Sequence, residues 1–400
     1  MGRNPNLDQA PSNIPVPLLD VNRGNSVLLP EIKETIASIL ESGRFIGGPY
    51  CQELEAAVAE ECDTEFAIGC ASGSDALLLA LMAIDIQPGD EVIVPSFTFF
   101  ASISAITRLG AHPVFIDIDP DTYNMDCDLL EGLITDKTKA IMAVHLFGQC
   151  ADMKTICEVA RKHELRVIED AAQAIGATFD GKRAGGIGDI GCTSFYPTKN
   201  LGGMGDGGML TTNNQKLAER IRLLANHGMQ PRYYHREVGI NSRLDSLQAA
   251  VLGIKIRHLS KYSVMRSGNA DTYHRLFTSN GMNQVLNLPG IHRQCGHVWN
   301  QFTVRVTGGR RDEVRQQLAD KGIGTEVYYP VPVHQQECYK HLNCSAGSLP
   351  ETERAAAEVL SLPIFPELTR VEIETVVTAL RDIMFGQQES FGEPRLRRAA

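Results

Sequence analysis

One lysine of this chain stands in a context that favours a reactive amine. Lys199 follows a short apolar segment that ends in Phe195-Tyr196-Pro197, and five glycines follow it between residues 202 and 208. Small residues let a bulky planar group approach the backbone closely. Burial lowers the pKa of an amine, which can then attack a carbonyl carbon near neutral pH. Most lysines are solvated surface residues, so it is the glycine-rich context that singles out Lys199.

A second candidate is the carboxylate of Asp170, in the segment LRVIEDAAQAIG (residues 165–176). An apolar strand pattern ends in Glu169-Asp170, and Gln173 follows among small residues. Ligands of open α/β sheets bind at the carboxyl ends of the strands, where Asp170 could keep a heterocyclic nitrogen protonated. The alternative is that Asp170 only caps the start of a helix.

Two further segments offer places for anions. Ser72-Gly73-Ser74-Asp75 opens an apolar helix pattern, whose free N–H groups and hydroxyls could hold a phosphate, although Ser and Asp are also ordinary helix caps. The segment 227–250 is the densest cationic stretch of the chain. Its cations are His227, Arg232, His235, Arg236 and Arg243. It fits either a subsite for carboxylate or phosphate or a solvated loop.

Other motifs exclude function classes. Gly185-Gly186-Ile187-Gly188 precedes a strand pattern rather than a helix, which argues against a dinucleotide fingerprint. The 11 histidines form no HxxxH or HExxH pair, so no metal site is expected. The net charge is 38 − 48 = −10, which argues against a nucleic-acid-binding surface.

The chemistry-bearing segments must be positioned by alternating strands and helices. Strand patterns occur at residues 91–95, 113–118, 140–146, 165–168, 191–196 and 208–211, and helix patterns at 31–61 (broken at 42–50), 74–84, 152–163, 215–227 and 243–261. This alternation predicts an α/β fold with a mostly parallel sheet.

Beyond residue 262 the rhythm changes to a strand at 301–306, helices at 312–321 and 369–384, and a proline-rich stretch at 329–333. We therefore expect a flexible start (1–15), a large α/β domain (16–262), a smaller α+β domain (263–386) and a disordered tail (387–400).

The location of the protein is also suggested by the sequence. No apolar run reaches the length of a membrane span, and the polar first residues do not resemble a signal peptide. Ten cysteines are scattered without a CxxC pair, as is typical of a reducing compartment. We expect a cytoplasmic protein.

The segments together resemble the DegT/DnrJ/EryC1/StrS family of nucleotide-sugar aminotransferases, which have the fold of aspartate aminotransferase (PLP fold type I). The resemblance runs from about Val16 to Phe385. It rests on SGRFIGGP, ASGSDALLLAL, GDEVIVPSFTFFAS, PVFIDIDPDTYN, KAIMAVHLFGQCADM, VIEDAAQAIGA, SFYPTKNLGGMGDGG, GINSRLDSLQAA and TEVYYPVPVHQQ, in this order.

The resemblance implies pyridoxal 5′-phosphate (PLP) as cofactor. Lys199 would bind it covalently, Asp170 would pair with its ring nitrogen and Gln173 would contact its phenolic oxygen. The other expected cofactor contacts are the aromatic face of Phe99, and Gly73, Ser74 and Ser194 around the phosphate. Asn241 would reach the phosphate from a second subunit, so the family implies a homodimer with shared active sites.

The resemblance also implies a nucleotide-linked keto sugar as substrate and L-glutamate as donor. The GINSRLDSLQAA segment looks like enzymes that aminate C3, with Ser242 and Arg243 leaving room and a cation near the cofactor. Arg243, Tyr328 and Tyr329 are the expected substrate contacts. UDP-linked 3-keto hexuronates and dTDP-linked 3-keto-6-deoxy sugars both fit. The alternatives are amination at C4, a dehydratase or lyase, and a non-catalytic regulatory protein. Ser242 and Arg243 could also do no more than begin a helix.

Overall fold

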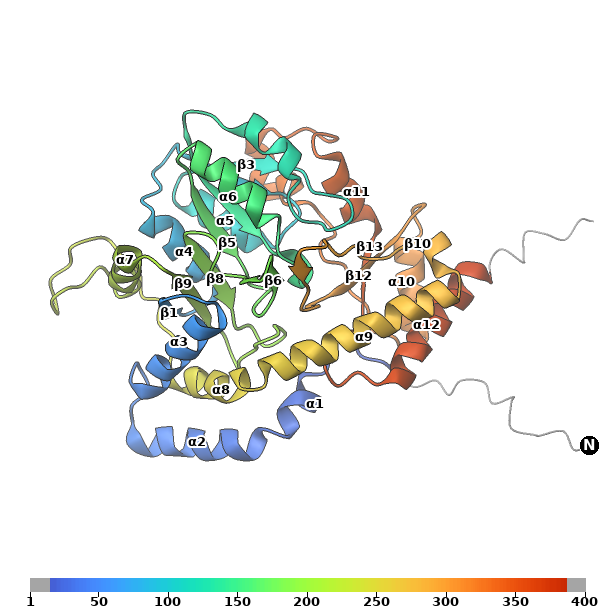
Figure 1. Ribbon diagram of the computed structural model, residues 1–400, viewed down its shortest axis with the longest axis horizontal. Helices are drawn as coiled ribbons and strands as arrows, with labels where there is room; N and C mark the ends of the chain where they lie inside the picture. Colours follow the sequence, from blue (N-terminus) through green and yellow to red (C-terminus); the bar gives the residue numbers. More distant parts are fainter. Residues whose placement is uncertain (1–14, 387–400) are drawn as a thin grey trace, which may run out of the picture.

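The computed structural model describes residues 15–386 of the chain. The predicted tail (387–400) and all but the last residue of the predicted flexible start (1–15) lie outside this range. Within it, an α/β part and a C-terminal α+β part are joined by one long helix (Figure 1).

The α/β part is built on a seven-stranded sheet. Its strand order is β1 (Phe66–Cys70), β9 (Gly208–Thr212), β8 (Ile190–Ser194), β5 (Arg166–Asp170), β4 (Thr138–Val144), β2 (Glu91–Pro95) and β3 (His112–Ile116). The strands from β8 to β3 are parallel, and β9 runs antiparallel to both of its neighbours. The prediction of an α/β fold with a mostly parallel sheet is confirmed.

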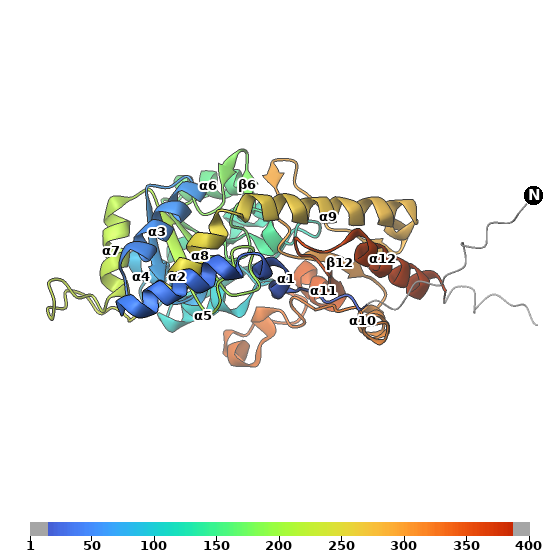
Figure 2. The same cartoon turned by 90° about the horizontal axis from the view of Figure 1, so that it is seen from below.

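Helices cover both faces of this sheet, which explains why its strands read as apolar runs rather than alternating patterns. One face packs against α4 (Gly73–Ala83), α5 (Phe100–Arg108) and α7 (Gln215–Ala225). The other packs against α3 (Pro49–Glu61), α6 (Met153–Lys162) and α8 (Ser246–Ile256). Figure 2 shows α3 and α5 on opposite sides of the sheet. Successive residues of one strand therefore enter different cores, such as Ile93 and Val94 of β2.

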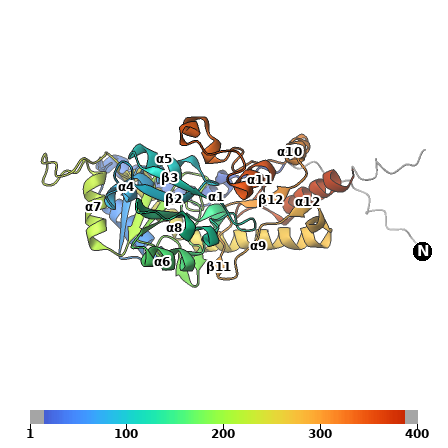
Figure 3. The same ribbon diagram turned by 90° about the horizontal axis from the view of Figure 1, so that it is seen from above.

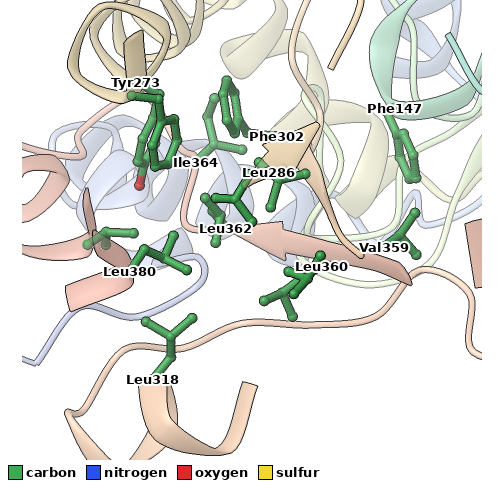
Figure 4. Packing of buried hydrophobic residues seen from close by; sticks show 14 of the residues in the cluster. Phe147, Tyr273, Leu286, Phe302, Leu318, Val359, Leu360, Leu362, Ile364 and Leu380 are labelled. Carbon is green, nitrogen blue, oxygen red and sulfur yellow. The ribbon is translucent and has the colours of Figure 1, made fainter. Parts of the chain in front are cut away.

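The C-terminal part has an apolar core around a small antiparallel sheet, and side chains of the α/β part such as Phe97 and Phe147 join this core. The sheet order is β10 (Leu286–Asn287), β12 (Phe302–Val306) and β13 (Val359–Leu362), packed against α9 (Leu259–Ser279), α10 (Arg311–Asp320), α11 (Pro350–Glu358) and α12 (Arg370–Phe385). Phe302, Leu362 and Tyr273 meet in this core (Figure 4). α12 begins with a capping box between Thr369 and Glu372, the usual stabilised helix start.

The structure changes three sequence-based expectations. The single helix predicted at 243–261 is two helices, α8 and α9, and Ser242 and Arg243 precede the first of them. Residue 262, where we placed the domain boundary, lies within α9. Strands β1 and β13 and helices α5 and α11 were also not predicted, because their patterns are short.

One local expectation is confirmed. Helix α2 (Leu29–Ser42) and α3 are separated by a turn in which Gly43, Gly47 and Gly48 all have positive φ.

The segment between α7 and α8 projects from the body of the chain at the end away from α12 (Figures 1 and 3). It carries several highly exposed side chains, including Tyr233 (74%) and Val238 (92%).

Further searches covered the described residues only. No helix among residues 15–386 is both long and apolar enough to cross a membrane. In the same range no group of three or more His, Cys, Asp or Glu side chains could hold a metal ion. All ten cysteines lie in this range and are free thiols.

Candidate active site

The carboxyl ends of the parallel strands open into a cavity of about 600 Å³. Its walls come from both parts of the chain. They are formed by Ser72, Gly73, Ser74, Leu77, Thr98, Phe99, Ala101, Val144, His145, Leu146, Asp170, Ala172, Gln173, Ser194, Tyr196, Thr198, Lys199, Asp206, Gly207, Gln301, Tyr328 and Tyr329. Nine of the eleven predicted site residues line this cavity, and the other two, Asn241 and Arg243, do not.

Asp170 lies at the cavity floor because β5 ends there. Its Oδ2 accepts a hydrogen bond from Ser102 Oγ (2.7 Å) and its Oδ1 accepts one from the Ala172 N–H (3.2 Å). No helix begins after β5 before β6 (Thr178–Phe179), so the alternative that Asp170 caps a helix is wrong. Burial raises the pKa of Asp170, although these hydrogen bonds and the Lys199 cation act in the opposite direction.

Lys199 lies in the turn between β8 and β9, and its backbone N–H bonds to the Tyr196 carbonyl (2.9 Å). Desolvation lowers the pKa of its amine to about 8, against the attraction of Asp170. An amine with this pKa is unprotonated in a larger share of molecules at neutral pH than a solvated lysine. It can therefore act as a nucleophile and as a proton carrier.

The lining of the cavity also includes a helix start that is suited to a phosphate. Gly73 and Ser74 form the first turn of α4, where backbone N–H groups lack intrahelical partners, and Ser194 ends the neighbouring strand β8. A Cβ added to Gly73 would lie 2.6 Å from Ser194 Cβ, so only glycine fits there. The Ser72 hydroxyl caps the helix through the Asp75 N–H (3.1 Å). The helix start is therefore compatible with both interpretations, because Ser72 caps it while Gly73 and Ser74 line the cavity.

Aromatic and amide side chains form the remaining walls. Phe99, 57% exposed, lies before α5, with its ring centroid 6.1 Å from that of Tyr329. Gln173 accepts a hydrogen bond from the Phe147 N–H (2.7 Å) and donates to Tyr329 Oη (3.3 Å). Tyr328 and Tyr329 come from the C-terminal part, so the cavity closes only when both parts of the chain are folded.

Asn241 and Arg243 lie outside the cavity and are exposed in this chain. Arg243 donates to Asn226 Oδ1 (2.8 Å), and Asn241 pairs through its backbone with Asn226. Ser242 between them is fully buried and bonds to Asp75 Oδ2 (2.7 Å). Ser242 therefore stabilises the first turn of α4 through Asp75. In this chain it neither leaves open space beside the cavity nor begins a helix.

Sequence reasoning missed several residues of the site. Ser102 holds Asp170, and His145 lines the floor beside it. His145 directly follows the apolar strand β4 at its carboxyl end, which is the criterion that selected Asp170 and would also have found His145. Ser102 has only the weak signal of a polar residue on the buried face of α5.

Comparisons with known proteins show the family of this chain. The family model of the DegT/DnrJ/EryC1/StrS aminotransferase family matches residues 28–381. A "Pleiotropic regulatory protein" of Geobacillus stearothermophilus is 46% identical, covering 92% of this chain and 98% of its own length. A UDP-N-acetyl-3-dehydro-alpha-D-glucosamine 3-aminotransferase of Acidithiobacillus ferrooxidans is 44% identical, covering 94% and 99%.

Two further matches come from Streptomyces venezuelae. A dTDP-3-amino-3,4,6-trideoxy-alpha-D-glucose transaminase is 44% identical, covering 92% of this chain and 96% of its own. The crystal structure of DesV in complex with a ketimine intermediate has a TM-score of 0.89 and 43% identity, covering 92% and 98%. With this coverage by the family model and by its relatives, the chain belongs to the DegT/DnrJ/EryC1/StrS aminotransferase family.

Proposed function

We propose that this aminotransferase moves an amino group from L-glutamate to the C3 keto group of a nucleotide-linked sugar, for the biosynthesis of an amino sugar. Its cofactor is PLP. The observation that carries the proposal is one cavity in which a desolvated amine, Lys199, and a buried carboxylate, Asp170, face a helix N-terminus. Ten free thiols fit a reducing compartment, which supports the cytoplasm as the place of the reaction.

The residues of the cavity fit PLP from end to end. The first turn of α4 with Ser74 and Ser194 would hold the phosphate, Phe99 would cover one face of the ring, and Gln173 would contact its phenolic oxygen. When bound, PLP supplies the electron sink for negative charge at the substrate carbon. Asp170 would keep the ring nitrogen protonated by its opposite charge.

Lys199 would have two tasks in the reaction. Its Nζ would hold the cofactor until the donor amine displaces it. The freed Nζ would then take a proton from the substrate carbon and return one to the product as general base and acid. The presence of Lys199 argues against the branch of the family that lacks this lysine and dehydrates its substrate. Lys199 together with Asp170 also favours catalysis over a purely regulatory role, even though one relative is named as a regulator.

Amination at C3 is supported by the relatives. Two of them, each 44% identical over more than nine-tenths of the chain, are named for products or substrates modified at C3, one linked to UDP and one to dTDP. The nucleotide therefore stays open, and C4 is the alternative position.

A second copy of the chain would complete the site. The cavity must bind a phosphate, a nucleoside diphosphate and the carboxylates of glutamate. Among residues 15–386, however, its lining contains no arginine and two acidic side chains, Asp170 and Asp206. The exposed segment that carries Arg232, Arg236, Asn241 and Arg243 could supply the missing cations from a neighbouring subunit. We therefore propose a homodimer with shared active sites.

Borohydride reduction of the holoenzyme, followed by peptide mapping, should place the cofactor on Lys199. Its desolvated amine faces the cavity, so we expect no label on the partly buried Lys255, whose pKa is also lowered to about 8. Lys199→Ala should lower turnover by several orders of magnitude. Label on any other lysine would contradict the assignment.

Gly73→Ala should weaken PLP binding because the new methyl group would collide with Ser194. Overpacking of this kind costs about 1–3 kcal/mol, which corresponds to about a 5- to 150-fold weaker affinity, measured by titrating the cofactor-free enzyme with PLP. Gly253→Ala is the matched control, because a Cβ there meets no atom within 4 Å. Equal affinities for the two variants would show that the phosphate binds elsewhere.

Mixing Lys199→Ala chains with Asn241→Ala chains should restore part of the activity. Each parent dimer would have two damaged sites, whereas a hybrid dimer would have one intact site. The measurement needs proof of subunit exchange by mass spectrometry. Absence of recovery after proven exchange would rule out a shared site.

The regiochemistry is tested with a panel of UDP- and dTDP-linked 3-keto and 4-keto sugars, hexuronates included, with glutamate or glutamine as donor. We expect an amine at C3, identified by NMR of the product, and faster turnover with glutamate. Turnover of 4-keto substrates alone would replace the C3 proposal by the C4 alternative.

A further inference from the structure

Beside the cavity floor lies a fully buried pair that the reaction described above does not use. Glu169 directly precedes Asp170 on β5, and His145 directly follows the neighbouring strand β4. Glu169 Oε2 lies 2.8 Å from His145 Nε2, and both side chains are 0% exposed. His145 lines the cavity and donates its backbone N–H to the Asp170 carbonyl (3.0 Å). The pair therefore adjoins the carboxylate that would serve the cofactor.

Four donors surround the Glu169 carboxylate. Besides His145, the backbone N–H groups of Gly185, Ile187 and Gly188 donate to it at 2.9, 2.7 and 2.6 Å. Burial alone would raise the pKa of Glu169, but the net shift is downward, and the hydrogen bonds from His145 and from the Gly188 and Gly185 N–H groups contribute to it. Glu169 is therefore ionised at neutral pH and can only accept hydrogen bonds.

This environment fixes the proton of the His145 ring. Because Glu169 only accepts, Nε2 must carry a hydrogen. The other ring nitrogen, Nδ1, lies 3.1 Å from the Ala151 nitrogen, and since a backbone N–H can only donate, Nδ1 must carry none. The two contacts together select the neutral imidazole with its proton on Nε2.

We propose that Glu169 and His145 are a positioning pair that holds the His145 ring neutral beside Asp170, and so reserves the Asp170 charge for the ring nitrogen of the cofactor. The effect on the cofactor depends on the proposed function, whereas the tautomer of His145 does not. A protonated His145 would place a second cation next to Asp170. That cation would repel the proton on the ring nitrogen and weaken the electron sink.

The other titratable groups near the pair do not supply a competing charge. Burial raises the pKa of the thiols of Cys62, Cys150, Cys157 and Cys192, which stay protonated at neutral pH. Burial also raises the pKa of Tyr329 on the cavity side. On the cavity side, Asp170 and the Lys199 cation attract each other. On the Cys62 side, the Arg183 cation is paired with the Glu61 carboxylate at 3.6 Å.

The tautomer can be measured without cofactor by ¹⁵N NMR of histidine-labelled apoenzyme, with the His145 signals assigned by their loss in His145→Gln. We expect the Nε2–H form of the neutral ring near neutral pH. A proton on Nδ1 would overturn the proposal.

Variants of the holoenzyme test the consequence. In Glu169→Gln the amide would turn an N–H toward His145 Nε2 and force the ring proton to Nδ1, against the Ala151 N–H. By analogy with the hydrogen-bonding partners of metal-ligating histidines, we expect kcat to fall about 10- to 100-fold, with little change in KM. The visible absorbance band of the bound cofactor should change its pH midpoint. Glu158→Gln, which removes an exposed carboxylate on α6, is the control and should change neither.

His145→Gln keeps the proposal testable if Glu169→Gln does not fold. The side-chain N–H of the introduced glutamine can replace Nε2–H as a permanently neutral donor to Glu169. In His145→Gln, the loss in kcat and the shift of the pH midpoint should therefore be smaller than in Glu169→Gln. If Glu169→Gln does not fold, His145→Ala takes its place in this comparison. Equal or larger changes would overturn the proposal. A wild-type chain with the expected tautomer but no cofactor band would instead refute the proposed function.

Discussion

A carboxylate buried at the end of a central strand loses the hydration that would stabilise its charge. Hydrogen-bond donors and cations nearby must therefore stabilise that charge instead. Asp170 is in this position, only 6% exposed. Its partners come from separate parts of the chain: Ser102 from α5, the Ala172 N–H from the turn after β5, and the Lys199 cation from the turn after β8. The parallel sheet brings these segments to one edge, and the site depends on this convergence.

The incomplete compensation of Asp170 has a functional meaning. A protonated heterocycle in the cavity would supply the missing positive charge, and the start of α4 in the same lining could hold a phosphate. The distribution of polar groups therefore matches a ligand with a cationic ring and an anionic tail, as PLP is. Behind the floor, Glu169 and His145 form a second, internally satisfied pair, which adds no net cation that would compete for Asp170.

Contacts between the two parts of the chain determine the shape of the cavity. Ser96, just after β2, lies 2.7 Å (Oγ) from His334 Nδ1 and accepts from the His334 and Val333 N–H groups. Asp117 accepts the first-turn N–H groups of α11 at Glu351 and Thr352. The Ser96 bonds join the segment before Phe99 to the segment after Tyr329, and the Asp117 bonds join the end of β3 to α11. Two walls of the cavity are thereby held at a fixed separation.

The sequence by itself determined the features whose signals are local. The glycine-rich context of Lys199, the strand end at Asp170 and the Ser-Gly-Ser helix start are contiguous motifs. The alternation of apolar runs predicted the α/β fold, and the order of many motifs indicated the family. Helix boundaries with glycines, such as the turn after Ser42, were also predicted, because positive φ strongly favours glycine.

Only the tertiary structure decided which distant side chains meet. Ser102 and Asp170 are 68 positions apart, and Ser242 and Asp75 are 167 apart. No local pattern encodes such a pairing. The split of the predicted helix 243–261 into α8 and α9 and the exposure of Asn241 and Arg243 outside the cavity are likewise properties of the packed chain. The tautomer of His145 depends on Glu169 and Ala151 together, because a ring proton is assigned by its neighbours in space and not in sequence.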